Sequence, residues 1–189
     1  MSGLQSAIAA GNREAVVALL AESAARASEP VENGVSPVIY ALYVREPEIA
    51  RLLAAAKSRL DVFEAAALGD ATSLAAVLAA DPLAAVDWSP DGFTALHLAA
   101  FLGDAACARI LIAAGAEVSA VSRNSMLVQP LHSAAASANV EVARVLLEHG
   151  ADANAEQQGG FLPLDSANQN HDAAMQALLL ERGARTSRP

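Results

Sequence analysis

The sequence repeats itself with a step of 33 to 35 residues, and this internal repeat constrains the fold more than any other feature. The segment TALHLAA at residues 94–100 recurs as QPLHSAA at 129–135 and as LPLDSAN at 162–168, at steps of 129 − 94 = 35 and 162 − 129 = 33 residues. Related segments begin at Leu60, Ser36 and Ser2. Units of this length stack in series, and each covers the apolar side of the next.

Each unit has the pattern of a short helix, a tight turn, a longer helix and an extended connection. The second half carries apolar residues at helical spacing, as in residues 106–111. Pro130 and Pro163 stand where a first helical turn has no amide hydrogen bond to lose. A glycine follows three of the longer helices, where a left-handed backbone closes a helix without strain. These glycines are Gly115, Gly150 and Gly183.

A step of 33 to 35 residues that carries TALH, QPLH and LPLD, then Ala-Ala, then Gly-Asp or its substitutes, resembles the ankyrin repeat. The match is most specific over residues 94–120 and 129–155. The resemblance implies an all-α fold, a solenoid of about six stacked helix-turn-helix units with short β-hairpin fingers, and a role in protein recognition. We expect a single domain over residues 1–189, with units at approximately 1–32, 33–57, 58–90, 91–122, 123–156 and 157–189.

Three features depart from the family pattern. The step from Ser36 to Leu60 is only 60 − 36 = 24 residues, so the hairpin between the second and third units should be missing or reduced to a turn, and the groove interrupted there. The third unit ends in Asp-Pro at residues 81–82, where other units have Gly-Ala. The first unit lacks the TALH-type segment, as expected of a cap with one face in water. The other cap is expected at residues 172–182, followed by a polar tail at 185–189.

The composition narrows the class of protein. Hydrophobic residues make up 54% of the chain and aromatic residues 4%, which favours close-packed helices of Ala, Leu and Val over sheets. The formal charge is −9 and no basic tract is present, so we expect no nucleic-acid partner. Cys107 is the only cysteine, which excludes an intramolecular disulfide and favours a reducing, cytoplasmic location. No segment resembles a signal peptide or a membrane span, so we expect a soluble protein without membrane contact.

The sequence contains no motif for catalysis or metal binding. His97 and His132 hold the histidine position of the family motif, where the resemblance implies a hydrogen bond to the backbone of a neighbouring unit. His149 and His171 are expected at exposed turns, and HExxH, GxSxG, GxGxxG and P-loop patterns are absent. Cys107 lies on an apolar stripe and is expected to be a small buried hydrophobe. Carboxylates recur at positions suited to helix starts and turns: Asp70, Asp104, Asp152 and Asp172. We expect no enzyme, no cofactor and no metal.

Partners of ankyrin repeats usually contact the finger tips and the exposed residues of the first helices. Carried over position by position, the expected exposed, partner-binding residues are Tyr43, Trp88, Asp91, Phe93, Phe101, Leu102, Arg123, Met126, Val128, Phe161 and Gln169. Five of the seven aromatic residues are in this set, and aromatic residues are enriched at interface centres. The alternative is that Phe93, Phe101 and Phe161 pack between fingers or helices, and that Trp88 braces its hairpin.

Three functions are compatible with these features. The first is a non-catalytic interaction module, an adaptor or an inhibitor, that binds a protein on its concave face and hairpin tips as a monomer. The second is a self-associating structural solenoid. The third is an enzyme built on this scaffold, which would need titratable side chains gathered in one pocket. We favour the first, with Trp88 and Phe101 as the expected affinity anchors.

Overall fold

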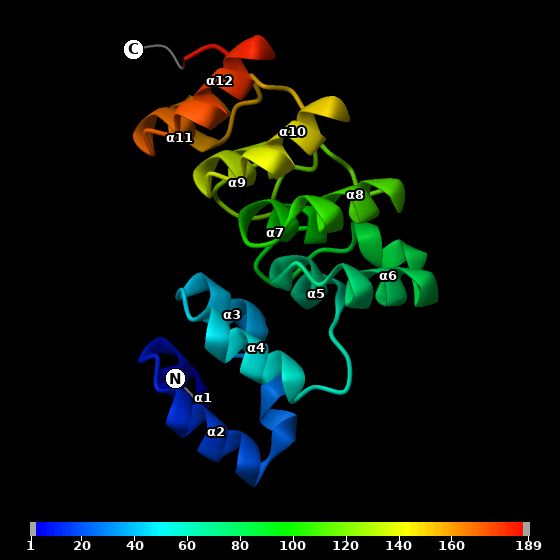
Figure 1. Ribbon diagram of the computed structural model, residues 1–189, viewed down its shortest axis with the longest axis vertical. Helices are drawn as coiled ribbons and strands as arrows, with labels where there is room; N and C mark the ends of the chain where they lie inside the picture. The colour runs from blue at the N-terminus through cyan, green and yellow to red at the C-terminus, as the bar shows by residue number, and fades with distance from the viewer. Residues whose placement is uncertain (1–2, 187–189) are drawn as a thin grey trace.

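The computed structural model describes residues 3–186, and this part of the chain consists of twelve α-helices with no β-strand (Figure 1). The helices are α1 (Gly3–Ala9), α2 (Arg13–Glu22), α3 (Pro37–Tyr43), α4 (Pro47–Ala55), α5 (Val62–Leu68), α6 (Ala71–Ala80), α7 (Ala95–Phe101), α8 (Ala105–Ala113), α9 (Pro130–Ala136), α10 (Val140–Glu148), α11 (Pro163–Gln169) and α12 (Ala173–Glu181). The predicted all-α class is confirmed. Residues 1–2 and 187–189, which include the end of the predicted polar tail, lie outside the described residues.

Four short 3-10 helices lie in three of the connections, two of them between α2 and α3. They are η1 (Ala24–Ser28), η2 (Glu32–Gly34), η3 (Pro82–Val86) and η4 (Gln158–Gly160). The longest of the described helices, α2 and α6, have ten residues each. None of the helices between residues 3 and 186 is long and apolar enough to cross a membrane.

Consecutive helices pack as pairs, from α1 with α2 to α11 with α12, and the pairs follow one another along the long axis of the molecule (Figure 1). The first helices of the pairs contact one another in an unbroken row from α1 to α11. The second helices form another row, which packs closely from α6 to α12 and between α2 and α4. This second row opens between α4 and α6. We call the side of the first helices the front and the side of the second helices the back.

Polar side chains determine where the second helices begin. The carboxylates of Asp70, Asp104 and Asp172 accept hydrogen bonds from backbone N–H groups in the first turns of α6, α8 and α12, as predicted. Asparagine has the same role in α2 and α10, at Asn12 and Asn139. Asp152 stabilises a turn instead, because its carboxylate accepts from the N–H of Asn154 at 2.8 Å. The recurring acidic residues are therefore structural.

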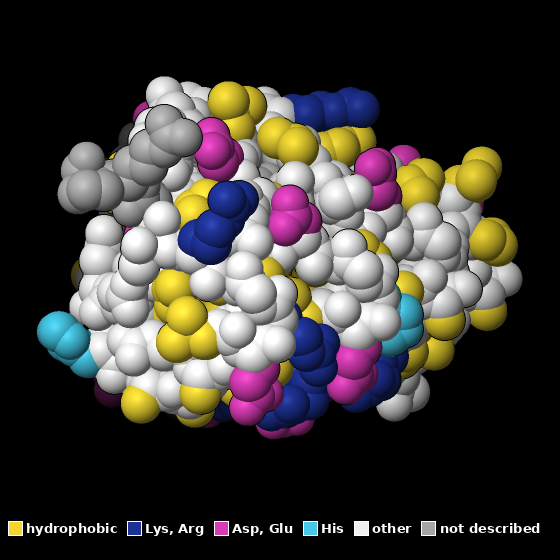
Figure 2. Space-filling view, turned by 90° about the horizontal axis from the view of Figure 1, so that it is seen from above, with side chains coloured by type: hydrophobic (Ala, Val, Ile, Leu, Met, Phe, Trp, Pro, Cys, Tyr) yellow, Lys and Arg dark blue, Asp and Glu magenta, His cyan; other side chains and the backbone are white. Residues whose placement is uncertain are grey.

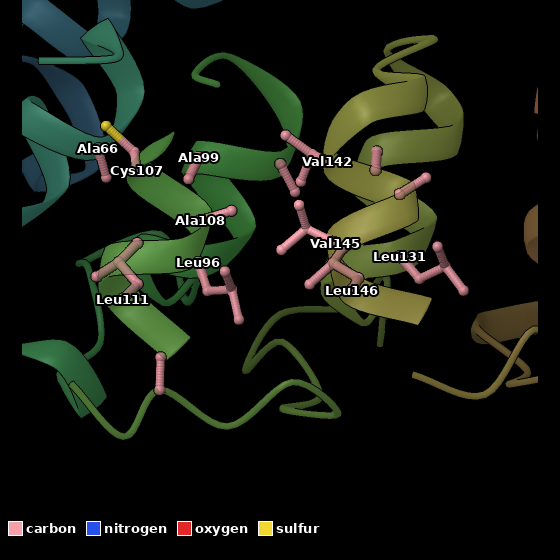
Figure 3. Close-up of a cluster of buried hydrophobic side chains, with 14 of the residues drawn as sticks. Ala66, Leu96, Ala99, Cys107, Ala108, Leu111, Leu131, Val142, Val145 and Leu146 are labelled. Carbon is pink, nitrogen blue, oxygen red and sulfur yellow. The ribbon is translucent and has the colours of Figure 1, made fainter. Parts of the chain in front are cut away.

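Small side chains allow the two rows of helices to approach closely. The Ala-Ala pairs of three successive units are completely buried. They are Ala65 with Ala66, Ala99 with Ala100, and Ala134 with Ala135. Larger side chains, including Leu96, Leu111, Leu131 and Leu146, fill the space between neighbouring pairs, and Cys107 lies among them as predicted (Figure 3). Closely packed protein interiors tolerate little change in side-chain volume.

The predicted β-hairpin fingers are not confirmed, since the described chain has only one isolated bridge, between Trp88 and Thr94. The connections instead contain turns closed by one backbone hydrogen bond. We call these turns the finger turns. They span residues 31–35, 89–93, 122–128 and 157–161, where the first residue donates its N–H to the carbonyl of the last at 2.7 to 3.0 Å. The short connection between α4 and α5 has no finger turn, as the 24-residue step predicted.

Candidate partner-binding surface

A cavity of about 430 Å³ lies on the front of the molecule, between the first helices and the finger turns. We call it the groove. Its lining is mostly apolar and consists of Tyr43, Phe93, His97, Leu98, Phe101, Met126, Val128, His132, Ser133, Ala136, Gln157 and Ser166. Five of the eleven residues predicted to bind a partner are thus brought together: Tyr43, Phe93, Phe101, Met126 and Val128.

The repeat positions these side chains. Helices α3, α5, α7, α9 and α11 follow one another in the front row, and residues of all of these except α5 line one wall of the groove. Three finger turns supply the opposite wall through Phe93, Met126 and Gln157. Phe101 and Met126 are the most accessible large apolar side chains of the lining, at 42% and 46% exposed. The groove therefore offers an apolar surface that water reaches.

Tyr43 closes one end of the groove through a long-range hydrogen bond. Its hydroxyl donates to Asp91 Oδ2 at 2.8 Å, and Ser89 Oγ donates to the other oxygen of the same carboxylate at 2.5 Å. Burial, followed by the nearby Asp91 charge, raises the pKa of Tyr43 well above its usual value. The phenol therefore remains a donor. The expected interruption of the groove between the second and third units is wrong on this side, because Tyr43 of α3 reaches the finger turn at 89–93.

His97 and His132 belong to the groove lining and connect their helices to the chain that leads to the next first helix. The Nδ1 atom of His97 accepts from the backbone N–H of Thr94 at 3.2 Å, so the ring proton is on Nε2, which donates to the Val128 carbonyl at 3.0 Å. His132 Nε2 donates to the Ala155 carbonyl at 2.9 Å. Burial lowers the pKa of His97 to about 4 and also lowers that of His132. The hydrogen bond to the backbone of a neighbouring unit is confirmed for His97, whereas the acceptor of His132, Ala155, lies near the end of its own predicted unit, 123–156.

Trp88 lies outside the groove lining. The Arg123 guanidinium stacks over its indole at 4.2 Å from the ring centroid, and the ring of His97 lies 6.3 Å from it on another side. A cation–π contact of this kind stabilises an exposed site by about 0.5 to 1 kcal/mol. Trp88 thus braces the contact between the finger turns at 89–93 and 122–128, which was the alternative interpretation of this residue.

The predicted residues also differ in how far they are buried. Val128 was expected to be exposed, and this is wrong: it is only 9% exposed, with its carbonyl bonded to His97 and its N–H donating to Ser122 Oγ at 3.0 Å. Leu102 is half-buried against the small cluster around Leu98. Phe161 is 44% exposed, and Gln169 is exposed at the end of α11, but neither lines the groove.

The predicted partner-binding set did not include the other seven residues of the lining, which are His97, Leu98, His132, Ser133, Ala136, Gln157 and Ser166. Leu98 and Ser133 follow the histidine of the TALH-type segment by one residue, and Ser166 follows the equivalent Asp165. Their shared place in the repeat was visible, although on the first helices only the residues after Ala-Ala were assigned to the exposed face. The groove lies deeper between helix and finger than that assignment assumed.

Residues 91–123 and 129–157 match the family model of the ankyrin repeat. No curated protein shows significant similarity to the chain. The chain therefore contains ankyrin repeats, as its sequence motifs indicated, and the two matched repeats contain α7 to α10 and most of the groove lining. Ankyrin repeats generally mediate protein–protein interaction, and the family is typically non-catalytic.

The titratable side chains of the described region neither lower the pKa of the Cys107 thiol nor form a cluster that could hold a metal ion. Burial raises the pKa of the Cys107 thiol to about 12, so the nucleophilic thiolate is disfavoured. Within residues 3–186 no three His, Cys, Asp or Glu side chains are placed to hold a metal ion. On the face seen in Figure 2, Lys and Arg side chains lie among Asp and Glu side chains. The groove lining itself contains no Lys, Arg, Asp or Glu.

Proposed function

We propose that the protein is a non-catalytic interaction module, an adaptor or an inhibitor, that binds a partner protein by holding apolar side chains of that partner in the groove. In this proposal all six helix pairs are ankyrin-type units of one solenoid domain over residues 1–189. The protein acts as a cytoplasmic monomer, and the finger turns form the rim of the contact.

The observation that carries this proposal is the groove, with Phe101 and Met126 exposed in an apolar lining. Its volume of about 430 Å³ is within the range of sites that bury a ligand or a group of side chains. Aromatic residues and Met are enriched at protein interfaces while acidic residues and Lys are depleted, and the lining follows this bias. An exposed apolar surface on a soluble domain commonly marks an interaction site.

Affinity capture from the source lysate tests the proposal. The wild-type protein, Phe101→Ala and a control, Leu180→Ala, would be immobilised in parallel. Leu180 is 57% exposed on α12 and does not line the groove. A partner held in the groove should be retained by the wild type and by Leu180→Ala, and its affinity for Phe101→Ala should be weaker by about 2 kcal/mol. Equal retention by all three proteins would contradict the groove as the binding site.

The contribution of Trp88 is tested in the same experiment. Because Trp88 supports Arg123 rather than the groove, Trp88→Ala should weaken capture through loss of the finger-turn contact. Size-exclusion chromatography with light scattering separates the proposal from self-association. A stable oligomer that requires Phe101 would show that the groove is occupied by a second copy of this chain.

A further inference from the structure

The connection between α4 and α5, residues 56–61, is unlike the other connections between helix pairs in the described chain. It runs from the C-cap of α4 at Ala56 to the N-cap of α5 at Asp61 without a finger turn. The buried apolar residues are divided at the same place: one cluster spans residues 4–53 and another spans residues 62–184. The two parts of the array therefore have separate main cores, and a smaller buried cluster on the front joins them.

The back of this connection is open. A cavity of about 730 Å³ lies there, lined by Ser28, by residues 57–63, and by one face of α6 and η3. Helices α4 and α6 do not pack together as the other neighbouring second helices do (Figure 1). Close-packed interiors resist bending because no space exists for atoms to move into. Here that space exists, so the back of the molecule permits a change of angle between the two parts.

The front of the connection is closed by contacts that span the missing finger. A Cβ atom added at Gly34 would lie only 3.1 Å from the Cβ of Pro90, so the finger turns at 31–35 and 89–93 touch directly. The Tyr43–Asp91 hydrogen bond joins the same two parts. A small apolar cluster lies beneath them and contains Val31, Val35, Ile39, Ala67 and Leu98.

A buried carboxylate at the centre of the connection links both parts. Glu64 of α5 is completely buried and receives hydrogen bonds from the Lys57 ammonium at 2.6 Å, from the Asp61 N–H at 3.1 Å and from the Ser36 hydroxyl. Asp61 and Glu64 hold the places of Thr94 and His97, at a step of 94 − 61 = 33 residues. Whereas His97 bonds to the following unit, Glu64 bonds backwards to Ser36.

We infer that residues 56–61 form a hinge, and that bending at this hinge opens and closes the Tyr43 end of the groove. In the closed form Tyr43 bonds to Asp91 and Lys57 is shielded by Glu64. In the open form the two finger turns separate at Gly34 and Pro90, the cavity on the back changes shape, and the contact between Lys57 and Glu64 loosens, so that Lys57 becomes accessible. The regulatory meaning of this motion rests on the proposed function, because Tyr43 is part of the groove.

Lys57 is the only lysine of the chain and is 11% exposed, so its chemical labelling reports on the hinge. The full chain would be treated with an acetylating N-hydroxysuccinimide ester, and mass spectrometry of peptides would separate acetylation of Lys57 from that of the terminal amine. Arg59→Lys supplies a reference, because residue 59 is exposed in the same connection. We expect Lys57 to react at least about tenfold more slowly than the reference lysine, because the hinge must open before the Lys57 ammonium becomes accessible.

Tyr43→Phe removes the hydroxyl that bonds to Asp91 and leaves the ring. Labelling of Lys57 should become about fivefold faster in this variant, a change that the loss of one hydrogen bond to a carboxylate allows. The matched control is Tyr40→Phe on the same helix, which lies outside the Tyr43–Asp91 contact and should leave the rate unchanged. Circular dichroism would confirm that all variants are folded at the labelling temperature.

Three results would overturn the hinge. Lys57 labelling as fast as the reference would show that the connection is not closed. Equal rates in Tyr43→Phe and the wild type would show that the groove end and the hinge are independent. A labelling rate that rises with low urea as steeply as global unfolding does would show that Lys57 reacts only from the unfolded chain. None of these measurements requires a partner, so failure of the hinge is distinguishable from failure of the capture experiment.

Discussion

His97 donates a hydrogen bond from Nε2 to the carbonyl of Val128, 31 residues further along the chain, at 3.0 Å. The imidazole also accepts from the N–H of Thr94, at the start of the same helix. One side chain thereby attaches the beginning of α7 to the finger turn that precedes α9. His132 repeats the arrangement one unit later with Ala155.

Removal of the His97 imidazole should therefore lower the free energy of unfolding strongly. His97→Ala leaves the Val128 carbonyl without its donor and leaves space beneath Trp88 and Phe93, at a combined cost of about 3 kcal/mol. Urea denaturation followed by circular dichroism would measure the change. His149→Ala is the matched control, since His149 is exposed at the end of α10, and its effect should stay within about 0.5 kcal/mol.

The stability of the protein should fall as the pH is lowered through the acidic range. Burial lowers the pKa of His97 from 6.5 to about 4, so between these pH values the unfolded chain binds a proton that the folded chain does not. Stability from this group is complete above pH 6.5 and decreases as the pH falls towards 4. From pH 7 to pH 5 the loss should be about 2 kcal/mol, and His132 acts in the same direction. The slope should become shallower in His97→Gln, and an unchanged slope would contradict this assignment.

The contact between two finger turns should make Gly92 more sensitive to substitution than Gly115. Both have a left-handed backbone, with φ of +84° and +94°. A Cβ at residue 92 would lie 2.9 Å from the backbone carbon of Arg123, whereas a Cβ at residue 115 meets nothing within 4 Å. Gly115→Ala should cost about 1 kcal/mol from backbone strain alone, and Gly92→Ala clearly more. Equal melting temperatures of the two variants would show that the close approach is unimportant.

The buried pair of Lys57 and Glu64 should contribute much more to stability than an exposed pair. Glu64→Gln leaves the Lys57 ammonium without its counter-charge and should cost about 3 kcal/mol. The control is Glu48→Gln, since Glu48 pairs with Arg51 on the surface, where a salt bridge contributes about 0 to 1 kcal/mol. The double variant Lys57→Met with Glu64→Gln should recover part of the loss in thermal unfolding. If Glu64→Gln and Glu48→Gln were equally stable, the pair would have no such role.

Much of the fold could be predicted from the sequence because the interactions that define the repeat join residues close together in the chain. The TALH-type segments, the capping carboxylates and the closing glycines each act within one helix or between adjacent helices, so spacing alone places them. The roles of His97 and His132 followed from the same regularity. The cross-molecule contacts did not, because Tyr43 and Asp91 are 48 residues apart and meet only because the finger between them is missing.

The sequence predicted which side of the molecule the candidate residues occupy, but not which of them line the groove. Tyr43, Phe93, Phe101 and Met126 were assigned to the front from their places in the repeat, and they line one cavity. Whether an individual side chain faces that cavity or braces a turn depends on its local partner. Trp88 turns towards Arg123, and such a pairing between successive finger turns leaves no periodic signal in the sequence.

The contact between Gly34 and Pro90, together with the Tyr43–Asp91 bond, affects how the array should fold. Repeat arrays are commonly described by the intrinsic stability of each unit and its coupling to the adjacent units. Here the second predicted unit contacts Pro90 at the very end of the third, and through the Tyr43–Asp91 bond it is also coupled to the start of the fourth. A one-dimensional description of this chain therefore needs an energy for the coupling between the second and fourth units as well as for each adjacent pair. If the third unit unfolded, its couplings to both neighbours would be lost, but the units at either end of the array could remain folded.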